Sequence, residues 1–140
     1  MKSLEQILPV TNATANDAHA FMFAPWVKML GLCDFEVREG SVRARLPERD
    51  ELKLVAGTIC GQVIMSAIDT VAAMAMCTTE RITKGTAYQH THFLRPAKGE
   101  DLLIEVSVTR FGKTSAFAEA RVTLAQSGTL IAHAVTEYAF

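Results

Sequence analysis

Residues 57–77, GTICGQVIMSAIDTVAAMAMC, form the stretch of sequence that decides the fold. From Gln62 onward the residues are apolar on nearly every face of a helix, which is typical of a helix surrounded by other structure. One carboxylate, Asp69, lies in the middle, and no Lys, Arg or His stands within one helical turn of it. A buried carboxylate is costly without a partner. Asp69 is therefore either a structural carboxylate bonded to a backbone or hydroxyl group, or a group kept for chemistry.

The start of this helix offers a second chemical feature. Gly57 and Gly61 are small and leave the first backbone N–H groups open to a carbonyl or an anion. Gly61 and Asp69 are eight residues apart, a rise of about 12 Å, whereas a general base or nucleophile works within about 3 Å of the reacting atoms. The two features can act together only if a two-fold axis sets the helix start of one subunit opposite Asp69 of another. The sequence predicts a homodimer with two shared sites.

Composition limits the class of protein. A chain of 140 residues fits one domain, residues 1–140, and its formal net charge of -1 gives no general attraction to nucleic acid or to an anionic membrane. Three cysteines without metal-like spacing indicate reduced thiols. The first residues lack the basic lead and apolar core of a secretion signal. We therefore expect a soluble cytoplasmic protein.

The order of the elements predicts an α+β fold. Residues 1–31 are expected to form an N-terminal helical segment, in which Trp26 anchors the chain to the core. Alternation and turn signals predict two strands within residues 33–46, with a turn at residues 39–40. Further strands are predicted at residues 86–94, 102–110, 115–125 and 129–138. Their connections are too short for crossover helices, so the sequence predicts a curled antiparallel sheet of five to six strands wrapped around one long central helix.

The same order, with CGQ opening the helix and AIDT in its middle, resembles the hotdog-fold acyl-CoA thioesterases, in particular their PaaI-like (phenylacetate-pathway) branch. The resemblance runs from about Trp26 to the C-terminus. It rests on GTICGQVIMSAIDT, residues 57–70, and on FLRPAKGEDLLIEVSVTRFGKTSAFAEARV, residues 93–122. It implies a hotdog fold that hydrolyses acyl-CoA thioesters without a cofactor, because coenzyme A is part of the substrate. It also implies a homodimer that often pairs again into a dimer of dimers.

The resemblance assigns roles to three residues. The family acid falls on Asp69, which acts either as a nucleophile or as a general base toward water. The backbone N–H of Gly61 polarises the thioester carbonyl. A polar residue early in the next strand, here Thr86, helps to hold the carboxylate or the water.

Other positions are expected to contact the substrate, and some depart from the family pattern. The family helix usually opens with His-Gly-Gly, where this chain has Cys60, Gly61 and Gln62, and an Asn or Gln that touches the carbonyl in many relatives is here Leu54. Removing one oxyanion donor typically costs about 100-fold to 1000-fold in rate, so this sequence is compatible with slow turnover. The charged residues that lie at turns and are candidates for the phosphates of coenzyme A are Arg95, Arg110 and Lys113.

Several alternatives stay open at this level. Cys60 could be a thiol nucleophile at a helix start. His90 and His92 share one face of a strand, which favours a strand surface or a subunit contact over a metal site, because a third ligand is lacking. A hotdog hydratase or dehydratase would use the same helix but normally adds a His to the acid. A non-catalytic acyl-CoA-binding module would bind the ligand without hydrolysing it.

Overall fold

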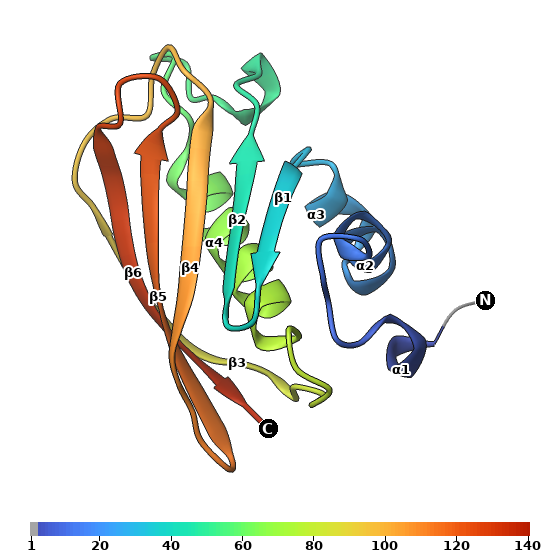
Figure 1. The fold of residues 1–140 in the computed structure, drawn as a ribbon. Coiled ribbons are helices and arrows are strands. Elements are labelled where there is room, and N and C mark those ends of the chain that lie inside the picture. Colours follow the sequence, from blue (N-terminus) through green and yellow to red (C-terminus); the bar gives the residue numbers. More distant parts are fainter. Residues whose placement is uncertain (1–2) are drawn as a thin grey trace.

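The computed structural model describes residues 3–140 (Figure 1). Three short helices precede the first strand, a single turn of 3-10 helix follows the second strand, and one long helix separates the first two strands from the other four. The elements in chain order are α1 (Leu4–Ile7), α2 (Ala15–Met22), α3 (Pro25–Lys28), β1 (Cys33–Arg38), β2 (Ser41–Leu46), η1 (Asp50–Leu52), α4 (Gly61–Met76), β3 (Gly85–Phe93), β4 (Leu102–Phe111), β5 (Ser115–Leu124) and β6 (Leu130–Ala139).

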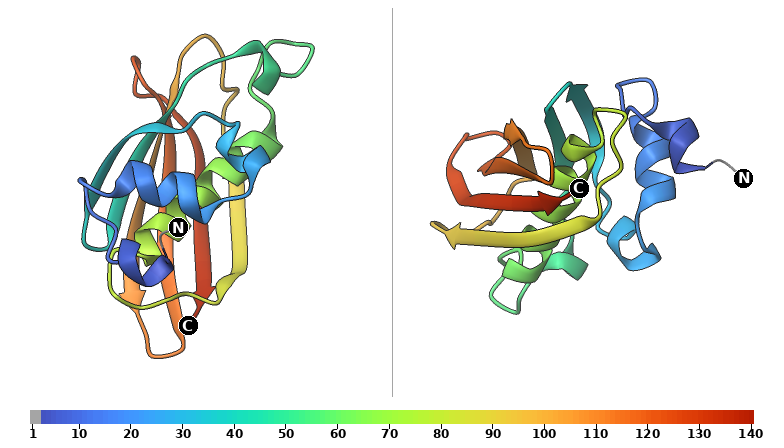
Figure 2. Two further views of the ribbon diagram at one scale, coloured as in Figure 1. Left: turned by 90° about the vertical axis from the view of Figure 1, so that its right-hand side faces the viewer. Right: turned by 90° about the horizontal axis from the view of Figure 1, so that it is seen from below.

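The strands form one six-stranded sheet in the order β1-β2-β4-β5-β6-β3. Every neighbouring pair is antiparallel, as the short connections predicted. The long helix α4 packs against one face of this sheet, where it contacts β2 to β6 (Figures 1 and 2). The structure therefore confirms the predicted α+β hotdog architecture. No helix within residues 3–140 has the length and apolar character needed to cross a membrane.

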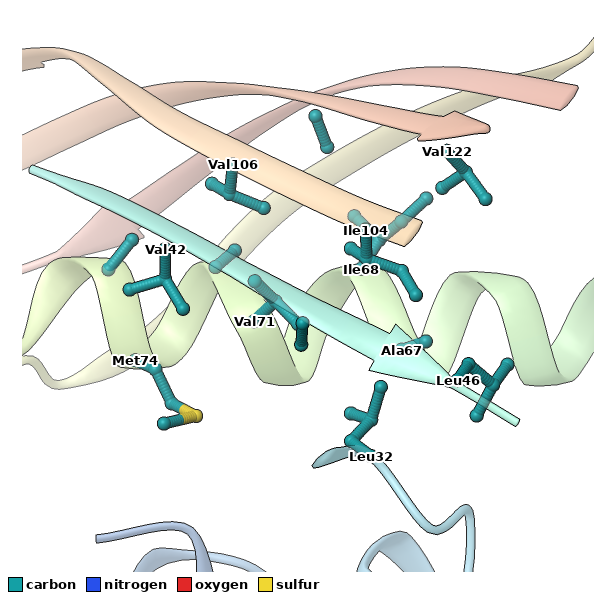
Figure 3. Packing of buried hydrophobic residues seen from close by; sticks show 14 of the residues in the cluster. Leu32, Val42, Leu46, Ala67, Ile68, Val71, Met74, Ile104, Val106 and Val122 are labelled. Carbon is teal, nitrogen blue, oxygen red and sulfur yellow. The ribbon is translucent and has the colours of Figure 1, made fainter. Parts of the chain in front are cut away.

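The core lies between α4 and the sheet (Figure 3). Ile68 and Val71 of α4 are fully buried against Val42, Ile104 and Val106 of the sheet. Burying one such side chain contributes about 1.5–3 kcal/mol, so this interface dominates the stability of the fold. As a consequence, the position of any residue on α4 relative to the sheet is fixed.

The N-terminal helices pack outside this core, beside β1 and across α4 (Figure 2). The side-chain oxygen of Asn12 accepts a hydrogen bond from the backbone N–H of Val37 at 2.7 Å, which ties this segment to the edge strand β1. The prediction that Trp26 anchors the segment is wrong, because its side chain is 60% exposed. Other apolar side chains of the segment fill that role instead, and the buried ones are Ile7, Val10, Ala15, Ala18 and Leu30.

One histidine in this segment makes stability depend on pH. The ring of His19 lies against Phe23 and Phe35, with ring centroids 5.7 and 5.1 Å away, and its Nε2 atom is buried without a hydrogen-bond partner among residues 3–140. Burial, and secondarily the charge of Lys28, lowers the pKa of His19 below 6.5. The unfolded chain therefore binds this proton more readily than the folded chain, and stability must fall as the pH drops below about 6.5.

We expect the free energy of unfolding to decrease between about pH 8 and pH 5 more steeply in the wild-type protein than in a His19→Leu variant. Urea denaturation at several pH values measures both curves. Parallel curves for the two proteins would contradict the assignment.

Candidate active site

Asp69, Thr86 and Tyr138 meet at one carboxylate oxygen. The Thr86 hydroxyl and the Tyr138 hydroxyl both lie 2.6 Å from Asp69 Oδ1, to which each can donate. These residues come from α4, β3 and β6, and Thr86 and Tyr138 stand directly opposite each other on neighbouring strands. The pairing register shifts between Thr86 and Tyr88. Such bulges turn side chains and are frequent next to active sites.

The hydrogen-bond partners of the Asp69 carboxylate are neutral. Both partners of Oδ1 are neutral hydroxyls, and Asp69 has no cationic partner among residues 3–140. Burial, and then the charge of Asp69, raises the pKa of Tyr138 far above its usual value, so this hydroxyl stays protonated and remains a donor. Asp69 Oδ2 has no hydrogen-bond partner within the same described residues, which leaves one oxygen open for reaction.

These three residues line a pocket of about 300 Å³. The opposite wall comes from the N-terminal helices and is mainly apolar. The apolar residues of this wall are Met22, Phe23, Trp26 and Val27. The pocket therefore offers a carboxylate beside apolar surface, and α2 and α3 determine its size.

The start of α4 carries open donors, as the glycines predicted. The backbone N–H groups of Gly61, Gln62 and Val63 have no acceptor within the described part of the chain, and the first helical bond runs from the Ile64 N–H to the Cys60 carbonyl at 3.3 Å. Gly61 lines a second pocket, of about 400 Å³, together with Phe93 and Arg95. Open N–H groups and the positive end of the helix dipole favour a developing negative charge at this point.

The two features lie in different pockets of one chain. The helix is unbroken from Gly61 to Met76, so Gly61 and Asp69 remain separated by a rise of about 12 Å. A single subunit therefore cannot bring both groups to one carbonyl.

The other residues predicted to bind substrate are dispersed. Cys60 precedes α4 with a half-buried side chain, and Leu54 is 55% exposed on the loop before it. Gln62 lines a third pocket, of about 310 Å³, which also includes Trp26. Arg110 is the second-to-last residue of β4, and Lys113 lies in the β4–β5 turn. Both are at the end of the sheet opposite the start of α4 (Figure 1).

The remaining thiols and imidazoles lie elsewhere. Burial raises the pKa of Cys77 to about 11, so its thiol stays protonated. His90 and His92 contact each other through their Nε2 atoms at 2.9 Å on exposed positions of β3. Residues 3–140 contain no group of three or more His, Cys, Asp or Glu side chains placed to hold a metal ion.

Tyr138 is the site residue that the sequence did not indicate. Alternation along β6 places it on the same face as Ala132 and Ala134, which is the inward face. That signal predicts burial, but it does not identify Asp69 as the partner, because the two residues are 69 positions apart.

Comparison with known proteins places this geometry in a family. Residues 56–131 match the thioesterase superfamily. Acyl-coenzyme A thioesterase 13 of Homo sapiens is 33% identical over 95 residues, which cover 66% of this chain and 68% of the human protein. The crystal structure of zebrafish thioesterase superfamily member 2 is 25% identical, covers 93% of this chain and 98% of its own, and has a TM-score of 0.84.

The PaaI protein of the Escherichia coli phenylacetic acid degradation operon shares the fold, with 21% identity, 89% of each chain covered and a TM-score of 0.76. The superfamily match includes α4 and β3, and hence both Asp69 and Thr86. The chain therefore belongs to the thioesterase superfamily and is a hotdog-fold thioester hydrolase.

Proposed function

We propose that this protein hydrolyses acyl-CoA thioesters to a free acid and coenzyme A in a site shared by two subunits. The observation that carries the proposal is the carboxylate of Asp69, which is held through one oxygen by two neutral hydroxyls and keeps the other oxygen open beside an apolar pocket. The name of the human relative supports acyl-CoA as the substrate class. Water is the only co-reactant that hydrolysis needs, so we propose that no cofactor takes part.

The reaction follows from where charge develops. A thioester carbonyl oxygen becomes negative as its carbon is attacked, and the open N–H groups at Gly61 would stabilise that oxygen. Asp69 either deprotonates a water that adds to the carbon, or attacks through Oδ2 to form a mixed anhydride that water then cleaves. In both routes the carbon–sulfur bond breaks and the departing thiolate of coenzyme A takes up a proton.

The sheet has an open edge that supports the dimer. The two edge strands of the sheet are β1 and β3. The helix α2 contacts β1, and β3 is the open edge. The Leu94 N–H donates a hydrogen bond to the Ile131 carbonyl of β6 at 2.8 Å. In an antiparallel pair only every second residue bonds the neighbouring strand. The backbone N–H and C=O groups that point away from β6 are therefore those of Gln89, Thr91 and Phe93. An unpaired edge of this kind readily accepts a strand from a second copy.

The pairing of dimers into tetramers and the cytoplasmic location stay predictions.

Large apolar side chains are exposed along this edge. Phe93 and Leu94 are each 50% exposed, Tyr88 is 54% exposed, and Met65 of the adjacent helix is 41% exposed. A second subunit that covered β3 and this side of α4 would bury them. Its own α4, running in the opposite direction, would then bring Gly61 toward Asp69.

Heterodimers test the shared site. Subunits carrying Asp69→Asn and subunits carrying Gly61→Pro are co-expressed with different affinity tags, and the mixed dimer is isolated through both tags. If the sites are shared, one site of this dimer receives both the Gly61 N–H and Asp69, and the other site receives neither. We therefore expect about half of the wild-type rate of thiol release per dimer. Each homodimer should be inactive.

The reverse combination is the matched control. A dimer of one wild-type subunit and one subunit with both substitutions places a single defect in each shared site, so it should be nearly inactive. Activity in this second dimer, and none in the first, would instead assign each site to one chain and overturn the proposed arrangement.

A further inference from the structure

We infer that Tyr138 is a positioning residue that, together with Thr86, holds Asp69 by Oδ1 and so assigns the reacting role to Oδ2. This inference rests on the proposed function. It adds a residue that acts through Asp69 and does not itself touch the substrate.

The Tyr138 hydroxyl has one charged acceptor within reach. The side chain is 1% exposed and is among the largest fully buried side chains of the protein. A buried phenol needs a hydrogen-bond partner, and its hydroxyl lies 2.6 Å from Asp69 Oδ1 and 2.7 Å from the Asp69 backbone carbonyl. The carboxylate is the stronger acceptor because it is charged. The hydroxyl therefore orients the acid and stays in contact with the helix backbone that carries it.

The scaffold holds both donors rigidly. Tyr138 pairs with Thr86 on β3 on one side and with Ala116 on β5 on the other, so it stands in an interior strand of the sheet. The register shift after Thr86 turns the threonine hydroxyl to the same oxygen. Two donors from adjacent strands fix the rotation of the carboxylate about its last bond. This restriction favours attack, because a base or nucleophile held in its reactive orientation loses less entropy in the transition state.

Tyr138→Phe removes the hydroxyl and keeps the ring. We expect kcat for acyl-CoA hydrolysis to fall about 10-fold with KM unchanged, because the lost contact acts on the attacking group and not on substrate binding. Thr86→Val should act in the same direction. The double variant should lose more than the product of the two single losses, since after one substitution the other hydroxyl still holds Oδ1.

Thr136→Val is the matched control. Thr136 lies on the same strand two residues earlier, is 3% exposed, and has a buried hydroxyl with no partner within residues 3–140. This variant also removes a buried hydroxyl, yet it should keep the wild-type kcat. Thermal denaturation checks that all variants are folded. Should Tyr138→Phe not fold, 3-fluorotyrosine at position 138, which keeps the ring and strengthens the donor, should change kcat at constant KM.

A folded Tyr138→Phe or fluorinated protein with wild-type kcat overturns the inference. A loss of kcat in Thr136→Val equal to that in Tyr138→Phe also overturns it. Asp69→Asn, assayed in parallel, separates this failure from failure of the proposed function. If Asp69→Asn is inactive while Tyr138→Phe is fully active, the hydrolase proposal stands and only the role of Tyr138 falls.

Discussion

Replacement of Asp69 by asparagine is expected to lower kcat for acyl-CoA hydrolysis by about 100-fold to 10,000-fold, the range for loss of a positioned acid–base group. The change is nearly isosteric, and an amide oxygen can still accept the hydroxyls of Thr86 and Tyr138, which both bond the present carboxylate. The amide cannot deprotonate water or form an anhydride at the same rate. Release of free thiol from a panel of aryl and aliphatic acyl-CoA thioesters, with wild type and variant side by side, measures the loss.

Asp50→Asn provides the matched control for this substitution. Asp50 lies on the short 3-10 helix before α4 with 98% of its side chain exposed, so loss of its charge should leave the rate of hydrolysis unchanged. Hydrolysis unaffected by Asp69→Asn would contradict the proposed function and would favour an acyl-CoA-binding module. A single turnover in ¹⁸O-labelled water then tests for the anhydride route, because water that attacks Cγ of Asp69 in the anhydride leaves the label in Asp69 and an unlabelled oxygen from Asp69 in the first product acid.

Much of the fold could be predicted because its signals are local. Gly40, with a φ of 76°, makes the predicted turn between β1 and β2. The helix α2 (Ala15–Met22) lies within the predicted N-terminal helical segment, residues 1–31. The apolar residues on nearly every face of a helix over residues 62–76 predict that other structure surrounds it. The helix α4 indeed packs between the sheet and the N-terminal helices (Figure 2).

The contacts that complete the site could not be predicted from local patterns. Thr86 was assigned through the family resemblance and not through its spacing from Asp69. Tyr138 reaches Asp69 only because β6 pairs with β3 in one particular register, and register depends on the whole sheet. Trp26 is predicted to anchor the N-terminal segment to the core. The short helix α3 instead leaves it exposed between two pockets that flank α4.

The central helix accounts for the arrangement of both halves of the site. Its apolar sides fix it against the sheet, its first turn leaves N–H groups without acceptors, and its middle carries the one carboxylate that Thr86 and Tyr138 hold. A straight helix keeps these two groups about 12 Å apart, so the chain gains a complete site only when a second helix lies alongside. The start of α4 is therefore expected to be as important for the rate of hydrolysis as the carboxylate.

Gly61→Pro is expected to lower kcat by about 100-fold to 1000-fold, the usual cost of one oxyanion donor. Proline lacks the backbone N–H but suits the first position of a helix, which Gly61 occupies in α4. The residue before it, Cys60, already has the extended conformation that proline requires, with φ of -71° and ψ of 152°. The substitution therefore removes the donor and leaves the helix in place, and steady-state kinetics with an acyl-CoA substrate measures the effect.

Gly61→Ala separates the lost donor from the added bulk. A Cβ at this position would lie 3.3 Å from the ring of Phe93, a contact that a shift of this side chain by a few tenths of an ångström relieves. Alanine and proline both add this atom, but only alanine keeps the N–H, so we expect Gly61→Ala to stay within about 10-fold of the wild-type kcat. Equal losses in the two variants would assign the effect to the contact with Phe93 and would remove the Gly61 N–H from the mechanism.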